Sequence, residues 1–192
     1  MLYYFNIIKI SIIYFFTALY LKKIKYRLKL CFILFHIKRE KMAKYKRVFL
    51  DGHSYYITII THRRVPILID NIKILRDSFR ESKKYFIYKI DAIVILPDHI
   101  HMIITPQNKM DYPKIIQAIK YNFSKRYNDD KNIEQSQSRY KHKMRAIWQK
   151  RYYEHTIRNE EDYNNCIEYI RLNPIKHQYI KNEEIWKYSS FK

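Results

Sequence analysis

The chain has 192 residues and a formal net charge of +20, from 38 Lys and Arg against 18 Asp and Glu. Its length is that of one domain, and its 47% hydrophobic content excludes a disordered chain. The single glycine, Gly52, excludes Gly-rich phosphate loops, and with them P-loop ATPases and Rossmann dehydrogenases. Two cysteines, Cys31 and Cys166, are too few for a disulfide framework or a Cys-based zinc site, and they indicate a reducing, cytoplasmic location. So large a positive charge indicates a polyanionic partner such as nucleic acid.

The chain changes character near Met42. Residues 1–41 form a hydrophobic, basic extension, whose apolar run over residues 1–21 is long enough to span a bilayer. It is open to three interpretations: a membrane anchor, an amphipathic or partner-binding segment, or AT-rich upstream DNA translated from a start placed too early. We favour the last interpretation, because low-GC codons yield Ile, Phe, Tyr and Lys without selection. The extension carries nine Lys and Arg against one Glu, so residues 42–192 keep a charge of +12.

From Met42 onward, segments with the periodicity of strands alternate with segments of helical periodicity. β-branched and aromatic runs predict strands, and a helix is expected to end where Asn173-Pro174 interrupts the last apolar pattern. The order β-α-β-β-α-β-α predicts an α+β domain, with a ferredoxin/RRM-like antiparallel sheet and helices packed on it. The predicted strands are 54–61, 85–96, 99–105 and, as short strands, 146–149 and 153–157; the predicted helices are 70–84, 111–127 and 160–172, and residues 128–143 are a predicted surface loop.

Two histidines, His99 and His101, stand two residues apart on a predicted strand. Such residues face the same side, so both imidazoles project together while Ile100 faces the opposite side. Two neutral imidazoles side by side suit a divalent cation and leave coordination positions open for substrate oxygens. The pair is a weak motif by itself, since two strand histidines can simply face solvent. Asp91 and Asp98 are candidates for orienting a histidine through a hydrogen bond.

Tyr169 and Asn173 form a second pair of candidate site residues, at the end of the last predicted helix. They are four residues apart and therefore share one face of the helix. A phenol there could attack phosphorus, and the amide oxygen could be a third metal ligand. The alternative for Tyr169 is a half-buried helix aromatic in a chain that has 20 tyrosines.

Basic side chains gather in two other places. Arg63 and Arg64 follow the first predicted strand, and a second set lies on the predicted helix 111–127 opposite its apolar face. Both sets are candidates for contacts with the DNA backbone, the alternative being a solvated basic surface. The helix set consists of Lys114, Lys120, Lys125 and Arg126.

The segment 96–101, Leu-Pro-Asp-His-Ile-His, resembles the His-hydrophobic-His ("HUH") signature of single-tyrosine transposases. Segments 56–64, 147–158 and 168–177 resemble the subgroup of REP-associated tyrosine transposases. The resemblance runs in order from Lys44 to Phe191, and residues 1–41 have no counterpart in it, which favours a domain that begins at Met42.

The resemblance implies a DNA transposase: a metal-dependent single-strand endonuclease and strand transferase that acts at hairpin-associated sites. His99, His101 and Asn173 would hold Mg²⁺ or Mn²⁺. Tyr169 would attack the DNA and leave a 5′-phosphotyrosine and a free 3′-OH, and another 3′-OH could reverse that link. Single-stranded or hairpin DNA would be the partner of a monomer or homodimer, with no membrane role unless residues 1–21 are a real anchor.

Several alternatives stay open beside this function. Tyr152 and Tyr153 are rival nucleophiles, and His155 is expected to be a structural or hydrogen-bonding histidine and not a metal ligand. A different class of protein is a non-catalytic RRM-like module that stacks single-stranded nucleic acid on aromatic rings. Its stacking platform would be Tyr55, Phe86 and Tyr88.

We expect a chain that begins at Met42 to fold and to bind hairpin DNA as tightly as the full chain. The reason is the break in composition at Met42, before the resemblance begins. Solubility and hairpin affinity of the two chains, measured side by side, check this prediction. An insoluble or non-binding product would show that residues 1–41 belong to the working protein.

Overall fold

The computed structural model describes residues 47–127, 147–181 and 184–191, and the described elements belong to one compact unit, Val48–Lys192. The extension predicted over residues 1–41 and the loop predicted over 128–143 lie outside the described residues. No helix among the described residues is long and apolar enough to cross a membrane. The strands are β1 (Tyr55–Ile60), β2 (Tyr88–Ile95), β3 (His99–Pro106) and β4 (Tyr153–Thr156); the helices are α2 (Ile72–Ser82), α3 (Tyr112–Arg126) and α5 (Glu160–Lys176), with short 3-10 turns η1 (His62–Arg64) and η2 (Lys109–Asp111).

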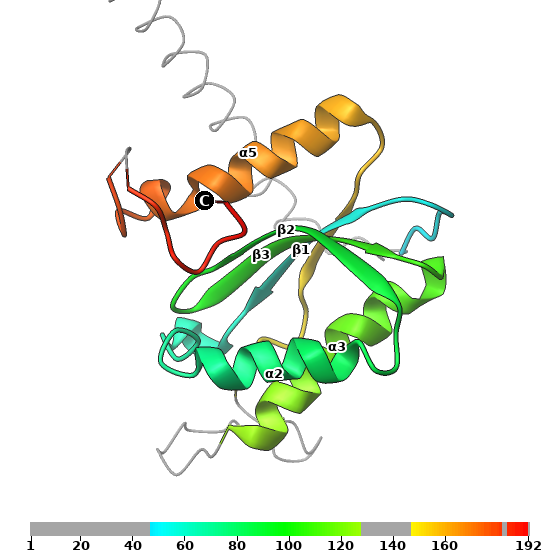
Figure 1. The fold of residues 1–192 in the computed structure, drawn as a ribbon. Helices are drawn as coiled ribbons and strands as arrows, with labels where there is room; N and C mark the ends of the chain where they lie inside the picture. Colours follow the sequence, from blue (N-terminus) through cyan, green and yellow to red (C-terminus); the bar gives the residue numbers. More distant parts are fainter. Residues whose placement is uncertain (1–46, 128–146, 182–183, 192) are drawn as a thin grey trace, which may run out of the picture. The chain divides into compact units, whose positions relative to one another are not determined.

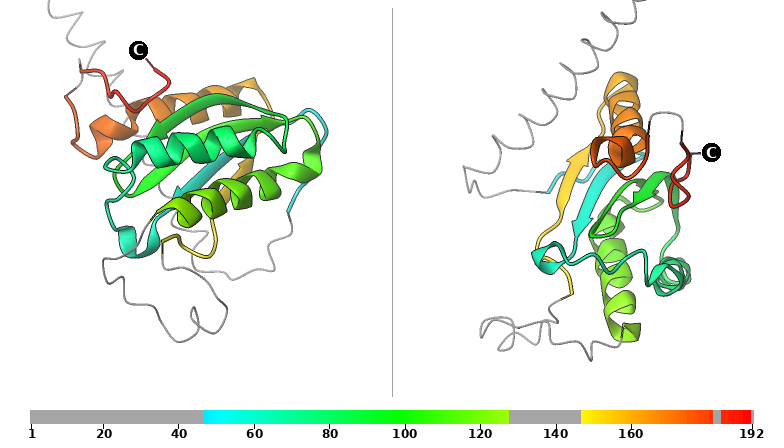
Figure 2. Two further views of the ribbon diagram at one scale, coloured as in Figure 1. Left: turned by 60° about the horizontal axis from the view of Figure 1, so that its bottom comes forward. Right: turned by 90° about the vertical axis from the view of Figure 1, so that its left-hand side faces the viewer.

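The four strands form one antiparallel sheet in the order β2-β3-β1-β4. Helices α2 and α3 pack together on one face of this sheet and α5 covers the other face (Figure 1). The view turned by 60° shows α2 and α3 running side by side across their face (Figure 2). The predicted α+β class with a ferredoxin-like antiparallel sheet is therefore confirmed.

The larger core lies between the sheet and the pair α2–α3. The strands contribute the side chains that point to this face of the sheet. Among them are Ile57 and Ile59 of β1 and Ile100 and Met102 of β3, all 1% exposed or less. The helices meet them with apolar stripes, as their three- and four-residue spacing predicts. These stripes consist of Leu75 and Phe79 on α2 and Ile115, Ile116, Ile119 and Phe123 on α3.

A smaller core lies on the opposite face, under α5. Strand residues that point to this face form it, including Tyr56 of β1 and Val94 of β2, and Ile170 is the fully buried contribution of α5. Polar residues that point to the same side of the sheet lie next to this cluster. They are Thr58, His99 and His101, and each is 3% exposed or less. The α5 face therefore combines a small apolar anchor with a buried polar region.

Several predicted boundaries differ from the structure by one to three residues, and two predicted elements are wrong by more than that. Residues 147–149 do not form the predicted strand. Trp148 makes one isolated β-bridge with Thr61, because the segment passes only the end of β1 and then turns away from it. Helix α5 does not stop at Asn173 but continues through Pro174 to Lys176. Pro174 removes one backbone donor in the last turn, and the amides of His177 and Tyr179 still bond the carbonyls of Asn173 and Pro174.

The C-terminal residues 184–191 run along the outer edge of β2. The amide of Ile95 donates to the Tyr188 carbonyl at 2.9 Å, and the amide of Ser190 donates to Ile93 at 2.9 Å. The indole of Trp186 also donates to the Ile95 carbonyl at 2.8 Å. These bonds satisfy part of an edge strand that would otherwise present unpaired backbone groups.

The stacking platform proposed for an RRM-like module is wrong. Tyr55 is 1% exposed and stacks on Tyr112 of α3, with ring centroids 4.1 Å apart. Tyr88 is 7% exposed and its hydroxyl is hydrogen-bonded to Ser82 of α2 at 2.6 Å. Phe86 packs against the same core. Tyr55 and Tyr88 point to the side of the sheet that α2 and α3 cover, so both are core residues and bases cannot reach their faces.

Replacing Ile115 by alanine should lower the free energy of unfolding by about 2–5 kcal/mol, because it leaves a cavity at a fully buried position between α3 and the sheet. Urea unfolding at equilibrium measures this change. Tyr121→Ala is the matched control on the same helix, since Tyr121 is 63% exposed and its loss should cost no more than about 0.5 kcal/mol. Equal losses in the two variants would contradict the described packing of α3.

Candidate active site

His99 and His101 lie side by side on β3, facing α5. Their ring centroids are 4.9 Å apart with the rings nearly perpendicular, and each residue is 3% exposed. Ile100 between them is fully buried in the core on the opposite face. The two-residue alternation of the strand therefore places both imidazoles together, as their spacing predicts.

Each imidazole is oriented through its Nδ1 atom. Nδ1 of His99 lies 2.5 Å from Oδ1 of Asp98. Nδ1 of His101 lies 2.7 Å from the Tyr56 hydroxyl and 2.9 Å from the Thr58 hydroxyl, both on the neighbouring strand β1. With Nδ1 engaged in both rings, Nε2 is the nitrogen left to bind an ion, and the bond at Nδ1 fixes the ring for that role.

Burial and the neighbouring charges keep Asp98 an anion and lower the pKa of His101. Burial acts to raise the pKa of Asp98, but its hydrogen bonds and ion pairs with His99 and Arg64 outweigh burial and lower that pKa to about 2. The Arg64 guanidinium lies 2.9 Å from the carboxylate. Burial lowers the pKa of His101 well below its usual range, and neighbouring basic groups, His99 foremost, lower it further. His101 therefore offers a lone pair at neutral pH.

Helix α5 brings Tyr169 to the histidines. Its ring centroid is 5.3 Å from that of His101 and 6.0 Å from that of Tyr56, edge-on in both cases. The ammonium of Lys176 lies 4.9 Å from the centre of the Tyr169 ring. The phenol, the imidazole pair and a cation thus meet at the C-terminal half of α5.

Asn173 supplies the observation that favours a bound cation. It is fully buried on α5, one turn after Tyr169, and neither Oδ1 nor Nδ2 has a hydrogen-bond partner among the described residues. An unsatisfied buried polar group costs about 1–3 kcal/mol, which a metal bond to Oδ1 would offset. Two imidazole nitrogens and an amide oxygen suit a divalent cation and leave positions for substrate oxygens.

The sequence did not reveal two groups that the structure adds to this site. His177 follows α5 directly, and its ring centroid is 5.0 Å from that of His99. Its sequence signals are its position four residues after Asn173 and its place at the end of segment 168–177, which resembles the family. Tyr56 and Thr58 bond His101 because β1 pairs with β3 so that Thr58 lies opposite His101. The sequence of β1 alone does not predict which residue of β3 lies opposite Thr58.

The candidate DNA contacts fall in two separate places. Arg63 and Arg64 form part of η1, and Arg64 reaches the site through Asp98. The set on α3 lies on the opposite face of the sheet from the histidines (Figure 1). There Lys114 pairs with Asp111, Arg126 pairs with Asp77 and Glu81, Lys120 donates to the Gln149 carbonyl, and Lys125 is exposed.

The two rival tyrosines lie on opposite faces of the sheet. Tyr152 packs against the core on the α2–α3 face, away from the histidines. Tyr153 of β4 lies on the α5 face, with its ring 6.1 Å from that of Tyr56. His155 of β4 makes the hydrogen bond expected of it, with Asp162 of α5. The Asp91 carboxylate accepts a hydrogen bond from the Thr105 hydroxyl and pairs with Lys89, and no hydrogen bond among the described residues joins it to His99 or His101.

Comparison with known proteins assigns the chain to a family. The family model described as "Transposase IS200 like" matches residues 49–173, which include both histidines, Tyr169 and Asn173. A protein of Escherichia coli named REP-associated tyrosine transposase is 32% identical over 152 residues, 78% of this chain and 83% of the relative. A Haemophilus influenzae protein assigned to the same group is 35% identical over 153 residues, 78% of this chain and 86% of the relative.

A solved structure shows the same fold. The structure of a REP-associated tyrosine transposase bound to a REP hairpin superposes with a TM-score of 0.64 at 30% identity, covering 78% of this chain and 83% of the other. Fold and family model together define a DNA transposase, an enzyme that cleaves DNA. The chain belongs to the IS200-like transposases and, within them, to the REP-associated tyrosine transposases. This family implies a divalent metal ion.

Replacing Asp98 by asparagine should weaken Mn²⁺ binding about 10- to 100-fold, because it removes the anion that fixes the ring of His99. Titration calorimetry with Mn²⁺ on the metal-free protein measures the change. Asp77→Asn is the matched control: Asp77 is an ion-paired acid on α2, on the other side of the sheet. Unchanged Mn²⁺ affinity in Asp98→Asn would show that His99 is not oriented by this carboxylate.

Proposed function

We propose that the chain cleaves single-stranded DNA with Tyr169 as nucleophile and rejoins it by strand transfer. Two observations at one site carry this proposal: the Tyr169 ring lies 5.3 Å from that of His101, and the fully buried Asn173 amide has no hydrogen-bond partner among the described residues. A divalent ion, Mg²⁺ or Mn²⁺, held by His99, His101 and Asn173 would polarise the scissile phosphate and offset charge in the transition state.

The chemistry assigned to Tyr169 is a transesterification. Its phenol oxygen forms a bond to phosphorus and loses its proton, while the bond from phosphorus to the 3′ oxygen breaks and that oxygen leaves as a 3′-OH. The product is a 5′-phosphotyrosine. Because the phosphodiester count is unchanged, an incoming 3′-OH can reverse the step and join a new strand without water or ATP.

We propose hairpin-associated single-stranded DNA as the substrate, by analogy with the relative that is bound to a REP hairpin. Two cations lie beside the site formed by His99, His101 and Tyr169 (the histidine–tyrosine site): Arg64, which pairs with Asp98, and Lys176, which lies over the Tyr169 ring. We propose that they contact the cleaved strand, together with Arg63, the neighbour of Arg64 in η1. The basic set on α3 lies on the other face, so any DNA contact there involves a part of the hairpin remote from the cleaved bond.

A single copy of the chain supplies His99, His101, Tyr169 and Asn173, whether it works as a monomer or as a homodimer. We propose that the activity resides in residues 42–192 and takes place in the cytoplasm, where the proposed DNA substrate lies. The described elements all fall in this range, and the family model begins within it at residue 49.

Replacing Tyr169 by phenylalanine should abolish the covalent adduct with DNA. The affinity for hairpin DNA should stay within about twofold of that of the unsubstituted chain. The substitution removes one oxygen and keeps the ring, so the basic surface that binds phosphate persists. Labelled hairpin DNA, incubated with Mn²⁺ and run on a denaturing gel, shows the adduct, and a filter or gel-shift titration gives the affinity.

Tyr163→Phe is the matched control on the same helix and should retain the adduct. Tyr153→Phe is the necessary second variant, because Tyr153 lies on the same face of the sheet. If Tyr169→Phe still forms the adduct and Tyr153→Phe does not, the nucleophile belongs to β4 and the proposed role of Tyr169 is wrong.

A further inference from the structure

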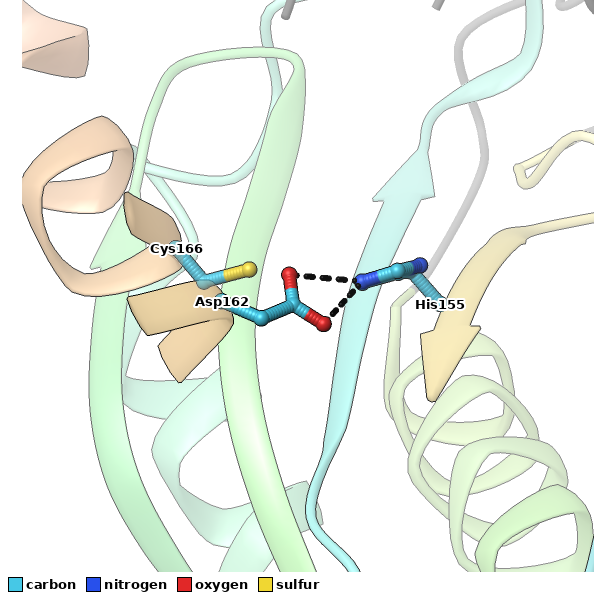
Figure 3. Close-up of side chains that lie close together, drawn as sticks. All are labelled: His155, Asp162 and Cys166. Carbon is cyan, nitrogen blue, oxygen red and sulfur yellow. Dashed lines mark hydrogen bonds and ion pairs between the residues drawn. The ribbon is translucent and has the colours of Figure 1, made fainter. Parts of the chain in front are cut away.

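A second group of potential ligands lies under the N-terminal half of α5. His155 projects from β4, and Asp162 and Cys166 project from α5 toward it (Figure 3). Nε2 of His155 lies 2.9 Å and 2.8 Å from the two carboxylate oxygens of Asp162. The ligand atoms of all three residues lie within 4.8 Å of one another. Nitrogen, oxygen and sulfur donors from two elements thus converge on one point.

The geometry of α5 explains this convergence. Asp162, Cys166, Tyr169 and Asn173 follow one another at spacings of four, three and four residues, which places them on one stripe of the helix. The C-terminal part of the stripe meets the histidines of β3. The N-terminal part meets β4, where His155 stands opposite Tyr56 and therefore faces the same side of the sheet.

We propose that His155, Asp162 and Cys166 bind one transition-metal ion of the zinc class, separate from the ion of the histidine–tyrosine site. Zinc accepts mixed imidazole, carboxylate and thiolate ligands at about 2.0–2.3 Å in a tetrahedron, so its ligand atoms stand about 3.3–3.8 Å apart. The three donors lie within 4.8 Å of one another, and on binding an ion the His155 and Asp162 atoms would move apart from their hydrogen-bond distances of 2.9 and 2.8 Å. On binding, the thiol proton leaves to solvent and the imidazole proton resides on Nδ1.

Ligand type separates this site from the first one. A thiolate is a soft ligand that selects zinc-class ions over Mg²⁺ and Mn²⁺, whereas the set His99, His101 and Asn173 contains no sulfur. The side chains of His155 and Asp162 are 29% and 25% exposed, so an ion can reach them and a water molecule can take the fourth position. The alternative for this cluster is an ion pair between His155 and Asp162 beside a thiol that takes no part.

The proposed ion would join the first two turns of α5 to β4. Cys166 stands three residues before Tyr169, so the ion would hold the helix that carries the phenol, as a positioning element away from the DNA. This inference does not depend on which tyrosine attacks DNA. It concerns metal binding by three residues outside the set proposed for cleavage.

Cobalt replaces zinc as the spectroscopic probe, because Co²⁺ bound to a thiolate gives a near-ultraviolet charge-transfer band that histidine-only sites lack. The full chain is stripped of metal with a chelator and titrated with Co²⁺. We expect a thiolate band that saturates at one equivalent per chain and is abolished by one equivalent of Zn²⁺. No thiolate band in the full chain would overturn the proposal and leave the ion pair as the role of the cluster.

Substitutions assign the band to its ligands. The chain has two cysteines, so Cys31→Ser is the matched control and should keep the band, whereas Cys166→Ser should lose it. His155→Ala and Asp162→Asn should each weaken Co²⁺ binding at least about tenfold, as expected when a ligand is lost. The double variant His99→Ala, His101→Ala should keep the band.

Two outcomes of the substitutions would overturn the proposal. One is a band that survives in Cys166→Ser, and the other is a band that only Cys31→Ser removes. Cys166→Ser changes a single atom, so the far-ultraviolet circular dichroism of its metal-free form should match that of the unsubstituted chain. That measurement keeps the test valid even where His155→Ala loses its fold.

Discussion

The site depends on one strand, β3, having both of its faces covered. Ile100 and Met102 are fully buried against α2 and α3, and a shift of one residue would carry them to the other face and the histidines into the apolar core. The large core therefore holds the register of β3, and that register alone fixes His99 and His101 beneath α5. Pairing with β1 then brings the hydroxyls of the neighbouring strand to His101. Stability and chemistry are thus set by alternate residues of the same eight-residue strand.

Helix α5 is the second half of the arrangement, and it is attached to the sheet by few apolar side chains. Ile170 and Pro174 are buried beside Asn173, so the anchor of the helix lies at the same turn as the groups that meet the histidines. The continuation of the helix past Pro174 matters for this reason. It keeps Lys176 in helical register with Tyr169, to within 4.9 Å of its ring, and leads directly to His177 beside His99.

Much of this could be predicted from the sequence, because it rests on local spacing. The alternation around Ile100 and the four-residue interval from Tyr169 to Asn173 each define a face without reference to the rest of the chain. What the sequence could not give is which face of the sheet each helix covers. For that reason the stacking surface predicted at Tyr55 and Tyr88 is wrong: α2 and α3 bury both rings. Contacts between distant segments, such as the hydrogen bond between Tyr56 and His101, depend on the same tertiary packing and leave no local pattern.

The proposed ligand set also suits the polyanion that this chain, with its charge of +20, is built to meet. Carboxylate ligands would neutralise a divalent ion and repel a phosphate, whereas two imidazoles and an amide are neutral and leave the ion its full charge. The cost is weaker binding of the ion itself. Asp98 would offset part of that cost without binding the ion itself. Its carboxylate holds the His99 ring in place, and Arg64 balances the negative charge of that carboxylate. In the proposed site the negative charge would thus orient a ligand without coordinating the ion, and Lys176 beside the Tyr169 ring would remain available to the phosphates of the strand.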